Sequence, residues 1–466
     1  MPRDPVVIDL GDVRQAQDPV PEARPGWPGW PGRRRGIGVL LVAVALAVVA
    51  GSAPLPALLV ERQVPARPAD LLGVFDDRLY VIGPNARQPG VANRTIAAYG
   101  LPGGQRLWHV ALPVTAQIPR LVRVGGVLLL QAYDTEGIEL VALDEGTGSV
   151  RWRRWASFLG VVPERPSEAL GGRNGTVLLG TGAAFAARTL RDRRDVILVV
   201  DPRTGGAIWS YRPPPGAHVL PVQASGGDEA TRMVTALVSG RVEVRDLATG
   251  RLIAAATLRE PVAPAADGAA EPWLSADEDL ILATGSADPG AVTAYGLERL
   301  DRRWTARWTG RWEGTGARVY VVGSACGDLL CLGIGDGDVQ AVERETGRVL
   351  WHADWLWAAP SGRLLLASSG RGSAETQRLV LLDPATGRTR HEVGRWGLAG
   401  RAAGDGWLVV RHDLRTARAW FGLLDPATAD VRLLGMVTDV AGDCQAGRHS
   451  VVCRRLDMSL GIWRYR

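Results

Sequence analysis

The chain has 466 residues, of which 46% are apolar, 22% charged and 6% aromatic, with 58 glycines and 30 prolines. These values are typical of a folded globular protein and exclude a disordered, a collagen-like or a many-pass membrane chain. The 54 basic and 49 acidic residues are interspersed and leave a net charge of +5 without a basic stripe, which argues against a nucleic-acid binder.

The composition is skewed in two ways. Every basic residue counted in the net charge is arginine, a pattern that GC-rich coding produces and that points to a high-GC bacterium. The chain also has 17 tryptophans against 7 tyrosines and 4 phenylalanines. This excess indicates that tryptophan is used at repeated positions instead of as general core filling.

The N-terminal region predicts a membrane anchor. Residues 1–35 are rich in proline and glycine without apolar periodicity, and we expect a disordered cytoplasmic tail. Residues 36–60 carry no charge and are long enough to cross the hydrocarbon layer as one helix. Because Arg33, Arg34 and Arg35 precede this segment, the positive-inside bias places the N-terminus in the cytoplasm.

A cleavable signal peptide is the alternative, since Gly51, Ser52 and Ala53 are the small residues that a signal peptidase requires. The leader of about 35 residues is unusually long for a signal peptide, and Pro54 would directly follow the cut. We therefore expect an uncleaved single-pass anchor, a linker over 61–69, and an extracytoplasmic domain over 70–466.

A repeat organises that domain. Residues 142–152 read Ala-Leu-Asp-Glu-Gly-Thr-Gly-Ser-Val-Arg-Trp, and the pattern returns at 199–209 and 341–351. Weaker copies lie at 98–108, 244–254, 294–304, 381–391 and 423–433. The eight copies are 40 to 57 residues apart at the tryptophan position, which is the length of one four-stranded propeller blade.

The repeat predicts an all-β fold, a β-propeller of four-stranded blades preceded by one transmembrane helix. Eight copies favour eight blades, with seven or nine as alternatives. Residues 438–466 remain after the last copy and still carry apolar strand patterns. This remainder either completes a blade at the other end of the chain or begins a ninth, incomplete one.

The motif residues have a structural explanation. An aspartate accepts hydrogen bonds from backbone N–H groups two residues on, the glycine supplies a positive φ, and burying the tryptophan contributes about 2 to 3 kcal/mol. We interpret them as scaffold residues because each recurs once per repeat. They are Asp144, Gly148, Trp152, Asp201, Gly205, Trp209, Gly347, Trp351, Asp383 and Gly387.

The pattern Ala-x-Asp-x-x-Thr-Gly-x-x-x-Trp, intact at 142–152, resembles the tryptophan-docking motif of pyrroloquinoline-quinone (PQQ)-type β-propellers. The resemblance covers roughly residues 70–466 and implies the fold more than a function. Proteins of this group include quinone-dependent dehydrogenases. They also include non-enzymatic relatives such as an outer-membrane assembly lipoprotein.

An enzyme of this group would need particular residues. Quinone dehydrogenases of this type hold a divalent cation with Glu and Asn and often carry two adjacent cysteines. Here no cysteines are adjacent, and neither a haem-attachment motif nor zinc spacing occurs. We therefore predict no catalytic residues, no metal ligands and no cofactor, with PQQ as the alternative; the residues that would bind a cofactor stay unknown.

The four cysteines form two close pairs in the segment expected outside the cytoplasm. Local disulfides between Cys326 and Cys331 and between Cys444 and Cys453 are favoured. The two other pairings, free thiols and a metal site are the alternatives.

The function expected is a membrane-anchored, extracytoplasmic binding or scaffold module. Its partner would be a protein or cell-envelope ligand on one propeller face, and the candidate contact loops are 84–95, 181–196 and 223–232. The alternative is a quinone-dependent dehydrogenase or a carbohydrate-active enzyme with a site in the central funnel.

Overall fold

The computed structural model describes residues 60–465, except for 85–93, 113–116, 134–136, 164–174, 182–195, 216, 224–229, 238, 259–273, 278, 285–289, 308–320, 327, 335–337, 354–356, 362, 370–377 and 403–405. Within the described ranges, no helix has the length and apolar character needed to cross a membrane. The expected tail over 1–35 and the expected anchor, up to residue 59, lie outside the described residues.

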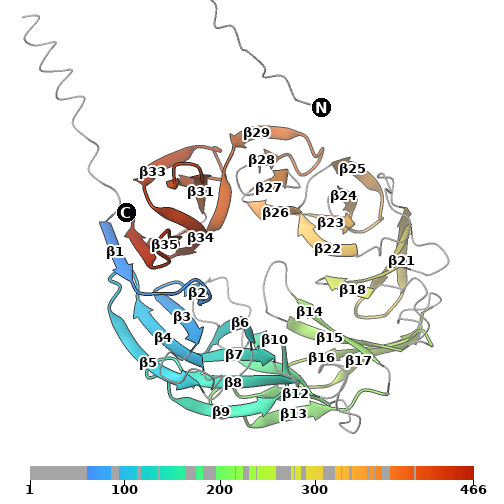
Figure 1. Cartoon of the computed structure of the whole chain (residues 1–466). Coiled ribbons are helices and arrows are strands. Elements are labelled where there is room, and N and C mark those ends of the chain that lie inside the picture. Colours follow the sequence, from blue (N-terminus) through green and yellow to red (C-terminus); the bar gives the residue numbers. More distant parts are fainter. Residues whose placement is uncertain are drawn as a thin grey trace, which may run out of the picture. The chain divides into compact units, whose positions relative to one another are not determined.

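The described chain folds into nine four-stranded antiparallel blades, numbered here in chain order (Figure 1). Blade 1 has β2 (Leu71–Phe75), β3 (Arg78–Pro84), β4 (Arg94–Gly100) and β5 (Arg106–Leu112). Blade 2 has β6 (Gln117–Val124), β7 (Val127–Tyr133), β8 (Ile138–Asp144) and β9 (Val150–Trp155). Blade 3 has β10 (Ser157–Pro163), β11 (Gly175–Thr181), β12 (Val196–Val200) and β13 (Ala207–Tyr211).

The next three blades continue the same pattern. Blade 4 has β14 (His218–Gln223), β15 (Ala230–Ala236), β16 (Arg241–Asp246) and β17 (Leu252–Thr257). Blade 5 has β18 (Leu274–Asp277), β19 (Leu280–Thr284), β20 (Ala291–Gly296) and β21 (Arg302–Arg307). Blade 6 has β22 (Val321–Cys326), β23 (Leu329–Ile334), β24 (Asp338–Glu343) and β25 (Val349–Ala353). One parallel pair, Gln223 with Asp277, joins the first strands of blades 4 and 5 into an eight-stranded sheet.

The last three blades complete the propeller. Blade 7 has β26 (Trp357–Ser361), β27 (Leu364–Ser369), β28 (Arg378–Leu382) and β29 (Thr389–Gly394). Blade 8 has β30 (Gly397–Arg401), β31 (Trp407–Asp413), β32 (Arg418–Leu424) and β33 (Val431–Val437). Blade 9 has β34 (Val440–Gly447), β35 (Ser450–Arg455), β36 (Leu460–Arg464) and, from the other end of the domain, β1 (Val60–Val64).

The N-terminal strand supplies the outer strand of the last blade. β1 pairs antiparallel with β36, with Val60 opposite Arg464 and Val64 opposite Leu460. The remainder 438–466 is therefore neither a completing piece nor an incomplete blade; it forms three strands of a complete ninth blade. The stretch 61–69, expected to be a linker, contains most of β1, so the propeller begins at Val60 instead of residue 70.

The preference for eight blades was wrong for a definite reason. Each repeat copy contains the turn between the third and fourth strands of a blade, as at Asp144 to Ser149 between β8 and β9. Blade 9 has no such turn, because its third strand, β36, is the last strand of the domain and its fourth strand, β1, is the first. A repeat count based on that turn therefore finds every blade except the one that closes the ring.

A buried arginine ties the chain ends together. Arg454 on β35 is 7% exposed and donates to the backbone oxygens of Arg67 and Asp70, each at 2.7 Å. Its Nε also donates to the Asp443 carboxylate at 3.1 Å. These bonds satisfy backbone oxygens in the connection from β1 to β2, and so they hold the last blade against the first.

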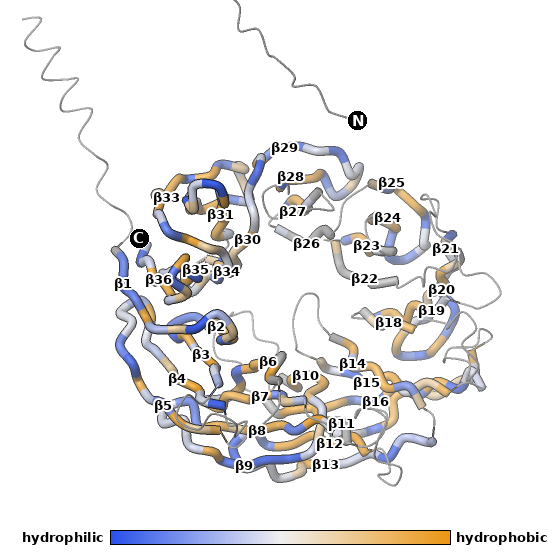
Figure 2. Tube along the Cα trace, in the orientation of Figure 1, coloured by the Kyte–Doolittle hydropathy of each residue, from blue (hydrophilic) through white to orange (hydrophobic). Residues whose placement is uncertain are grey.

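The core lies between blades. Among the described residues, nine apolar clusters each combine side chains from two neighbouring blades. Leu128 and Leu130 of β7, for example, pack with Tyr80, Ile82 and other residues of blade 1. Outer strands such as β9 and β29 are mostly exposed and hydrophilic (Figure 2). Each blade is thus amphipathic and is stable only against its neighbours.

The propeller has two faces that differ in their connections. We call the ends where the first strand joins the second, and the third joins the fourth, the turn face. We call the opposite ends, where the second strand joins the third and each blade joins the next, the loop face. Since strands alternate in direction, the connections 84–94 and 181–196 open on the loop face, whereas 223–230 opens on the turn face.

Candidate functional site

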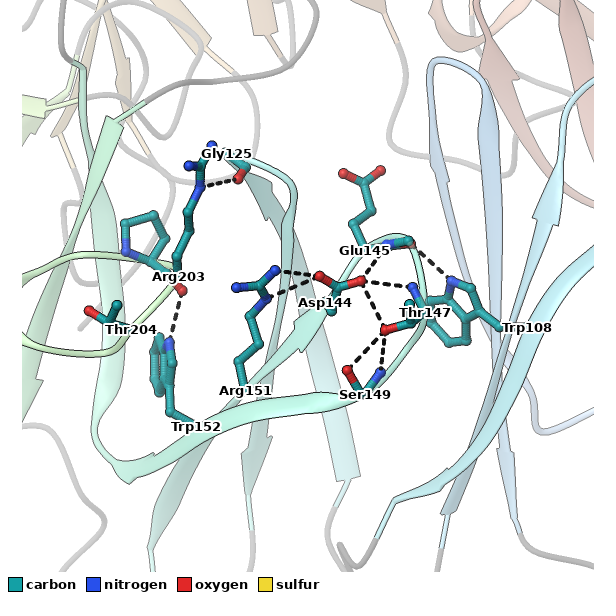
Figure 3. Close-up of polar contacts among 12 residues, drawn as sticks. Trp108, Gly125, Asp144, Glu145, Thr147, Ser149, Arg151, Trp152, Arg203 and Thr204 are labelled. Carbon is teal, nitrogen blue, oxygen red and sulfur yellow. Dashed lines mark hydrogen bonds and ion pairs between the residues drawn. The ribbon is translucent and has the colours of Figure 1, made fainter.

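The motif turn has the geometry predicted from its residues. Asp144 Oδ1 accepts hydrogen bonds from the backbone N–H groups of Gly146 and Thr147, at 3.0 and 2.8 Å, and from the Thr147 hydroxyl at 2.9 Å (Figure 3). Gly148 has φ of +74° and donates to the Asp144 backbone oxygen at 2.8 Å. The aspartate and the glycine therefore fix the turn between β8 and β9 together.

The other copies repeat this turn. Asp201 accepts from the N–H groups of Arg203 and Thr204 at 2.7 and 3.0 Å, and Asp383 accepts from Ala385 and Thr386 at 2.9 and 3.1 Å. The corresponding glycines, all with φ between +65° and +73°, are Gly205, Gly250, Gly347 and Gly387.

Each motif tryptophan reaches the turn of the following blade. Its indole Nε1 donates to the backbone oxygen of the residue that follows the motif acidic residue there. The pairs are Trp108 with Glu145 (2.9 Å), Trp152 with Pro202 (2.8 Å), Trp209 with Leu247 (2.8 Å), Trp304 with Arg344 (2.8 Å) and Trp351 with Pro384 (2.7 Å). Figure 3 shows the two pairs that flank blade 2.

The indole ring packs against the motif glycine of the same turn. A Cβ atom on Gly148 would lie 2.5 Å from the Trp108 ring, and one on Gly205 would lie 2.7 Å from the Trp152 ring. Similar overlaps occur at Gly347 and Gly387, and a Cβ atom on Gly250 would make a tight contact of 3.1 Å with the Trp209 ring. The glycine is therefore required twice, once by its φ and once by the ring that lies on it.

After blades 4 and 7, which lack the motif tryptophan, the next turn lacks the motif glycine as well. Ala254 of blade 4 faces a blade 5 turn with Leu300 (φ +55°) in the glycine position, and Leu300 is buried with Leu297 and Tyr295 in the joint. His391 of blade 7 precedes a blade 8 turn with Ala429 (φ +65°). In these two joints the two residues are thus matched, as expected for a packing interaction.

Electrostatic interactions reinforce the motif turns. Arg151 forms an ion pair with Asp144, and hydrogen bonds from Arg151 and then from Thr147 lower the pKa of the Asp144 carboxyl to about 2. Hydrogen bonds from Thr346 and Arg348 likewise lower the pKa of Glu343, which takes the aspartate position in blade 6. The acidic residues are therefore ionised anchors of a turn at neutral pH.

Glu145, which is not one of the predicted motif residues, lies in a buried ionic cluster between blades 1 and 2. Its Oε1 is 2.7 Å from Nε of Arg123 and 3.4 Å from Nε of Arg78, and it accepts a hydrogen bond of 3.2 Å from the Tyr80 hydroxyl. Burial, and then the negative charge of Glu145, raise the pKa of Tyr80. The position after the motif aspartate varies between repeats, so no sequence signal identified this residue.

Both favoured disulfides are present. Cys326 with Cys331 links β22 to β23 in blade 6, and Cys444 with Cys453 links β34 to β35 in blade 9. Each bridge joins the first strand of a blade to the second, and no described cysteine is free.

The predicted motif residues do not converge on one place. Their turns are distributed around the propeller, one at each of several blade joints, with their polar groups bonded to the next turn or to their own. Among the described residues, no group of three or more His, Cys, Asp or Glu side chains is arranged to hold a metal ion. Of the candidate loops, residues 85–93, 182–195 and 224–229 lie outside the described residues.

Comparisons with solved structures find propellers of low sequence identity. The chain has 15% identity to BamB from Moraxella catarrhalis, with 87% of this chain and 98% of that chain covered and a TM-score of 0.40. It has 10% identity to the C-terminal WD40 domain of Sif2, with 87% and 99% covered and a TM-score of 0.40. A quinohemoprotein alcohol dehydrogenase from Pseudomonas putida HK5 has 16% identity, with 65% and 62% covered and a TM-score of 0.37.

No curated protein matches the sequence significantly. The model of the PQQ-like family described as outer membrane protein assembly factor BamB matches residues 92–332, just over half of the 466 residues. The matched region runs from the first repeat copy into blade 6 and includes both intact motif turns of blades 2 and 3. The chain belongs to this BamB-type family of PQQ-like β-propeller repeat proteins.

Proposed function

We propose that this protein is a membrane-anchored, extracytoplasmic propeller that binds another protein or a cell-envelope ligand and performs no catalysis. The observation that carries the proposal is that the repeat residues make contacts between blades. The five motif tryptophans and the turns that they contact form blade joints. These residues therefore stabilise the scaffold and do not serve as a cofactor site. The BamB-type family match supports an interaction with another protein, by analogy of fold.

The proposed anchor would join the propeller at β1. The uncharged segment 36–60 runs directly into the strand that begins at Val60. The name of the family refers to assembly at an outer membrane, and we propose only the more general role of a binding or scaffold module for this chain.

Reporter fusions test the topology. Alkaline phosphatase fused after Arg466 is expected to be active, and green fluorescent protein fused at the same place is expected to be dark, because the C-terminus would lie outside the cytoplasm. Carbonate extraction of membranes should leave the full chain in the pellet. An inactive phosphatase fusion together with a fluorescent green fluorescent protein fusion would reject the topology. Release of the chain from membranes by carbonate would reject the anchor.

Calorimetry tests the absence of a quinone cofactor. Purified full-length protein is titrated with PQQ in the presence of calcium, with a quinone-dependent dehydrogenase as the positive control. We expect no saturable heat for this protein. A stoichiometric, calcium-dependent binding curve, together with alcohol- or sugar-dependent dye reduction, would reject the proposed binding module and support the dehydrogenase alternative.

A further inference from the structure

A row of exposed and half-buried side chains crosses blade 8 at its loop-face end. Trp396 directly precedes β30, Arg411 lies on β31 opposite Trp420 of β32, and Trp420 lies opposite Met436 of β33. The four residues, which we call the Arg411 row, thus follow one another across all four strands. With strands about 4.8 Å apart, the row spans roughly 14 Å, which an extended peptide of about four residues would cover.

The guanidinium of Arg411 is held between two indole rings. Its Cζ lies 4.8 Å from the ring centroid of Trp420 and 5.6 Å from that of Trp396. Trp396 is itself fixed by packing on the apolar cluster between blades 7 and 8. Stacking holds the planar group in place and leaves its N–H edges for a bidentate anion.

Arg411 differs from Arg245, a stacked arginine of blade 4. Arg245 lies 4.1 Å from the Tyr211 ring centroid, but it also forms an ion pair of 3.2 Å with Glu243. No carboxylate of the described residues forms an ion pair with Arg411, which is exposed. Its charge is therefore not compensated within the described part of the blade.

The surroundings of the row add positive charge. Arg395, Arg415 and Arg418 are exposed in the same end of the blade. The nearest acidic residue along the chain, Asp413, is occupied by its own turn, where it accepts from the N–H groups of Arg415 and Thr416 and from the Thr416 hydroxyl. An approaching carboxylate would thus meet a local excess of arginine.

We propose that the Arg411 row is the docking site for an acidic peptide segment of a partner protein. A Glu or Asp of the partner would accept two hydrogen bonds from Arg411, and a neighbouring apolar side chain would cover Trp420 and Met436, which is 45% exposed. Tryptophan, methionine and arginine are the residue types enriched at the centres of protein interfaces, which favours a peptide over a small anion. The proposal rests on the proposed function as a binding module.

A selection from random peptides tests this without assuming a partner. The full chain, purified in detergent, is used to select from a phage-displayed library of random dodecapeptides, and the enriched peptides are synthesised for fluorescence anisotropy. We expect enriched peptides to share an acidic residue next to apolar ones. Their binding to Arg411→Gln should be at least tenfold weaker than to the wild type, and their binding to Arg411→Lys should be weakened less. Binding to the wild type should also weaken at high salt.

A matched variant and three outcomes decide the result. Arg251→Gln changes another exposed arginine, in a blade 4 turn on the opposite face, and should leave peptide binding unchanged. Enriched peptides that bind Arg411→Gln as well as the wild type would overturn the proposal, as would the absence of any enriched peptide. Arg411-dependent binding of uronic-acid oligosaccharides without peptide binding would reassign the row to an anionic glycan. The topology fusions fail or succeed independently of these results.

Discussion

The indole Nε1 of Trp108 in blade 1 lies 2.9 Å from the backbone oxygen of Glu145 in blade 2. The same ring lies on Gly148, three residues further along that turn. One side chain therefore uses both its polar and its apolar part to hold the neighbouring blade. Since four other joints repeat the arrangement, the stability of the ring depends on it.

Gly148→Ala is expected to destabilise the protein by about 2 to 5 kcal/mol. The positive φ alone costs an alanine about 1 to 2 kcal/mol, and overlap with the Trp108 ring adds about 1 to 3 kcal/mol. Gly126→Ala is the matched control in the same blade, because Gly126 has φ of +76° but a methyl group added there would meet no other atom within 4 Å. Urea unfolding followed by tryptophan fluorescence measures both. Equal losses in the two variants would mean that ring contact does not contribute.

The joint between blades 4 and 5 should accept the tryptophan–glycine pair that it lacks. Ala254→Trp alone would overpack against Leu300 and cost about 1 to 3 kcal/mol. Leu300→Gly alone would open a cavity and cost about 2 to 4 kcal/mol. In the double variant the new indole fills the space left by the leucine, so we expect a favourable coupling free energy of at least about 1 kcal/mol. Additive losses in the double-mutant cycle would show that these positions are not matched.

The architecture was predictable because it depends on a local signal that recurs. The Asp144 turn, its glycine and Trp152 lie within a few residues of one another, and their spacing repeats in each complete hairpin. Both disulfides were predictable for the same reason, since each joins two adjacent strands. The ninth blade was not, because its β1–β36 pair joins residues about 400 positions apart along the chain.

Contacts between blades were harder to predict than the blades themselves. The sequence indicated that Trp152 is a scaffold residue, but not that its Nε1 bonds to Pro202 or that Gly205 lies under its ring. The Arg411 row was also missed, because Arg411 and Trp420 become neighbours only through strand register. Such surface rows leave no periodic signal in the sequence.

The short disulfide of blade 9 should stabilise the closing blade. Replacing Cys444 and Cys453 by serine removes a bridge with a sequence separation of 9, and loop-closure entropy then predicts a loss of roughly 2 to 3 kcal/mol. Differential scanning fluorimetry should show a lower Tm for this variant under oxidising conditions. The two proteins should differ less after reduction with dithiothreitol, and an unchanged difference would indicate packing losses instead of a lost cross-link.

Asp144 predicts a stability loss at acidic pH. Its pKa of about 2 in the folded protein is below the value of about 3.9 in an unfolded chain. A lowered folded pKa means that the ionised carboxylate stabilises the protein above about pH 4, and that this contribution is lost as the pH falls towards 2. The stability difference between wild type and Asp144→Asn should therefore shrink over that range. In Arg151→Gln, which lacks the main cause of the shift, the contribution should be smaller, and its loss should be complete at a higher pH.

Removal of β1 should open the ring. Without residues 60–64, β36 becomes an unpaired edge strand, and the buried Val64 leaves the cluster between blades 9 and 1. A protein that starts at residue 65 is therefore expected to aggregate or to unfold at lower urea than one that starts at residue 57. Size-exclusion chromatography and urea unfolding compare the two proteins.

A point variant and a peptide distinguish the loss of the β1–β36 pairing from the effect of merely shortening the chain. Val64→Asp in the full chain puts a charge into the apolar cluster at the ring closure, and it should destabilise the protein by several kcal/mol. The control Glu61→Gln changes an exposed position of the same strand and should cost less than about 1 kcal/mol. A synthetic peptide of residues 57–67 added to the protein that starts at residue 65 should restore its stability by pairing with β36. If the shortened protein is as stable as the longer one and ignores the peptide, β1 does not close the ring.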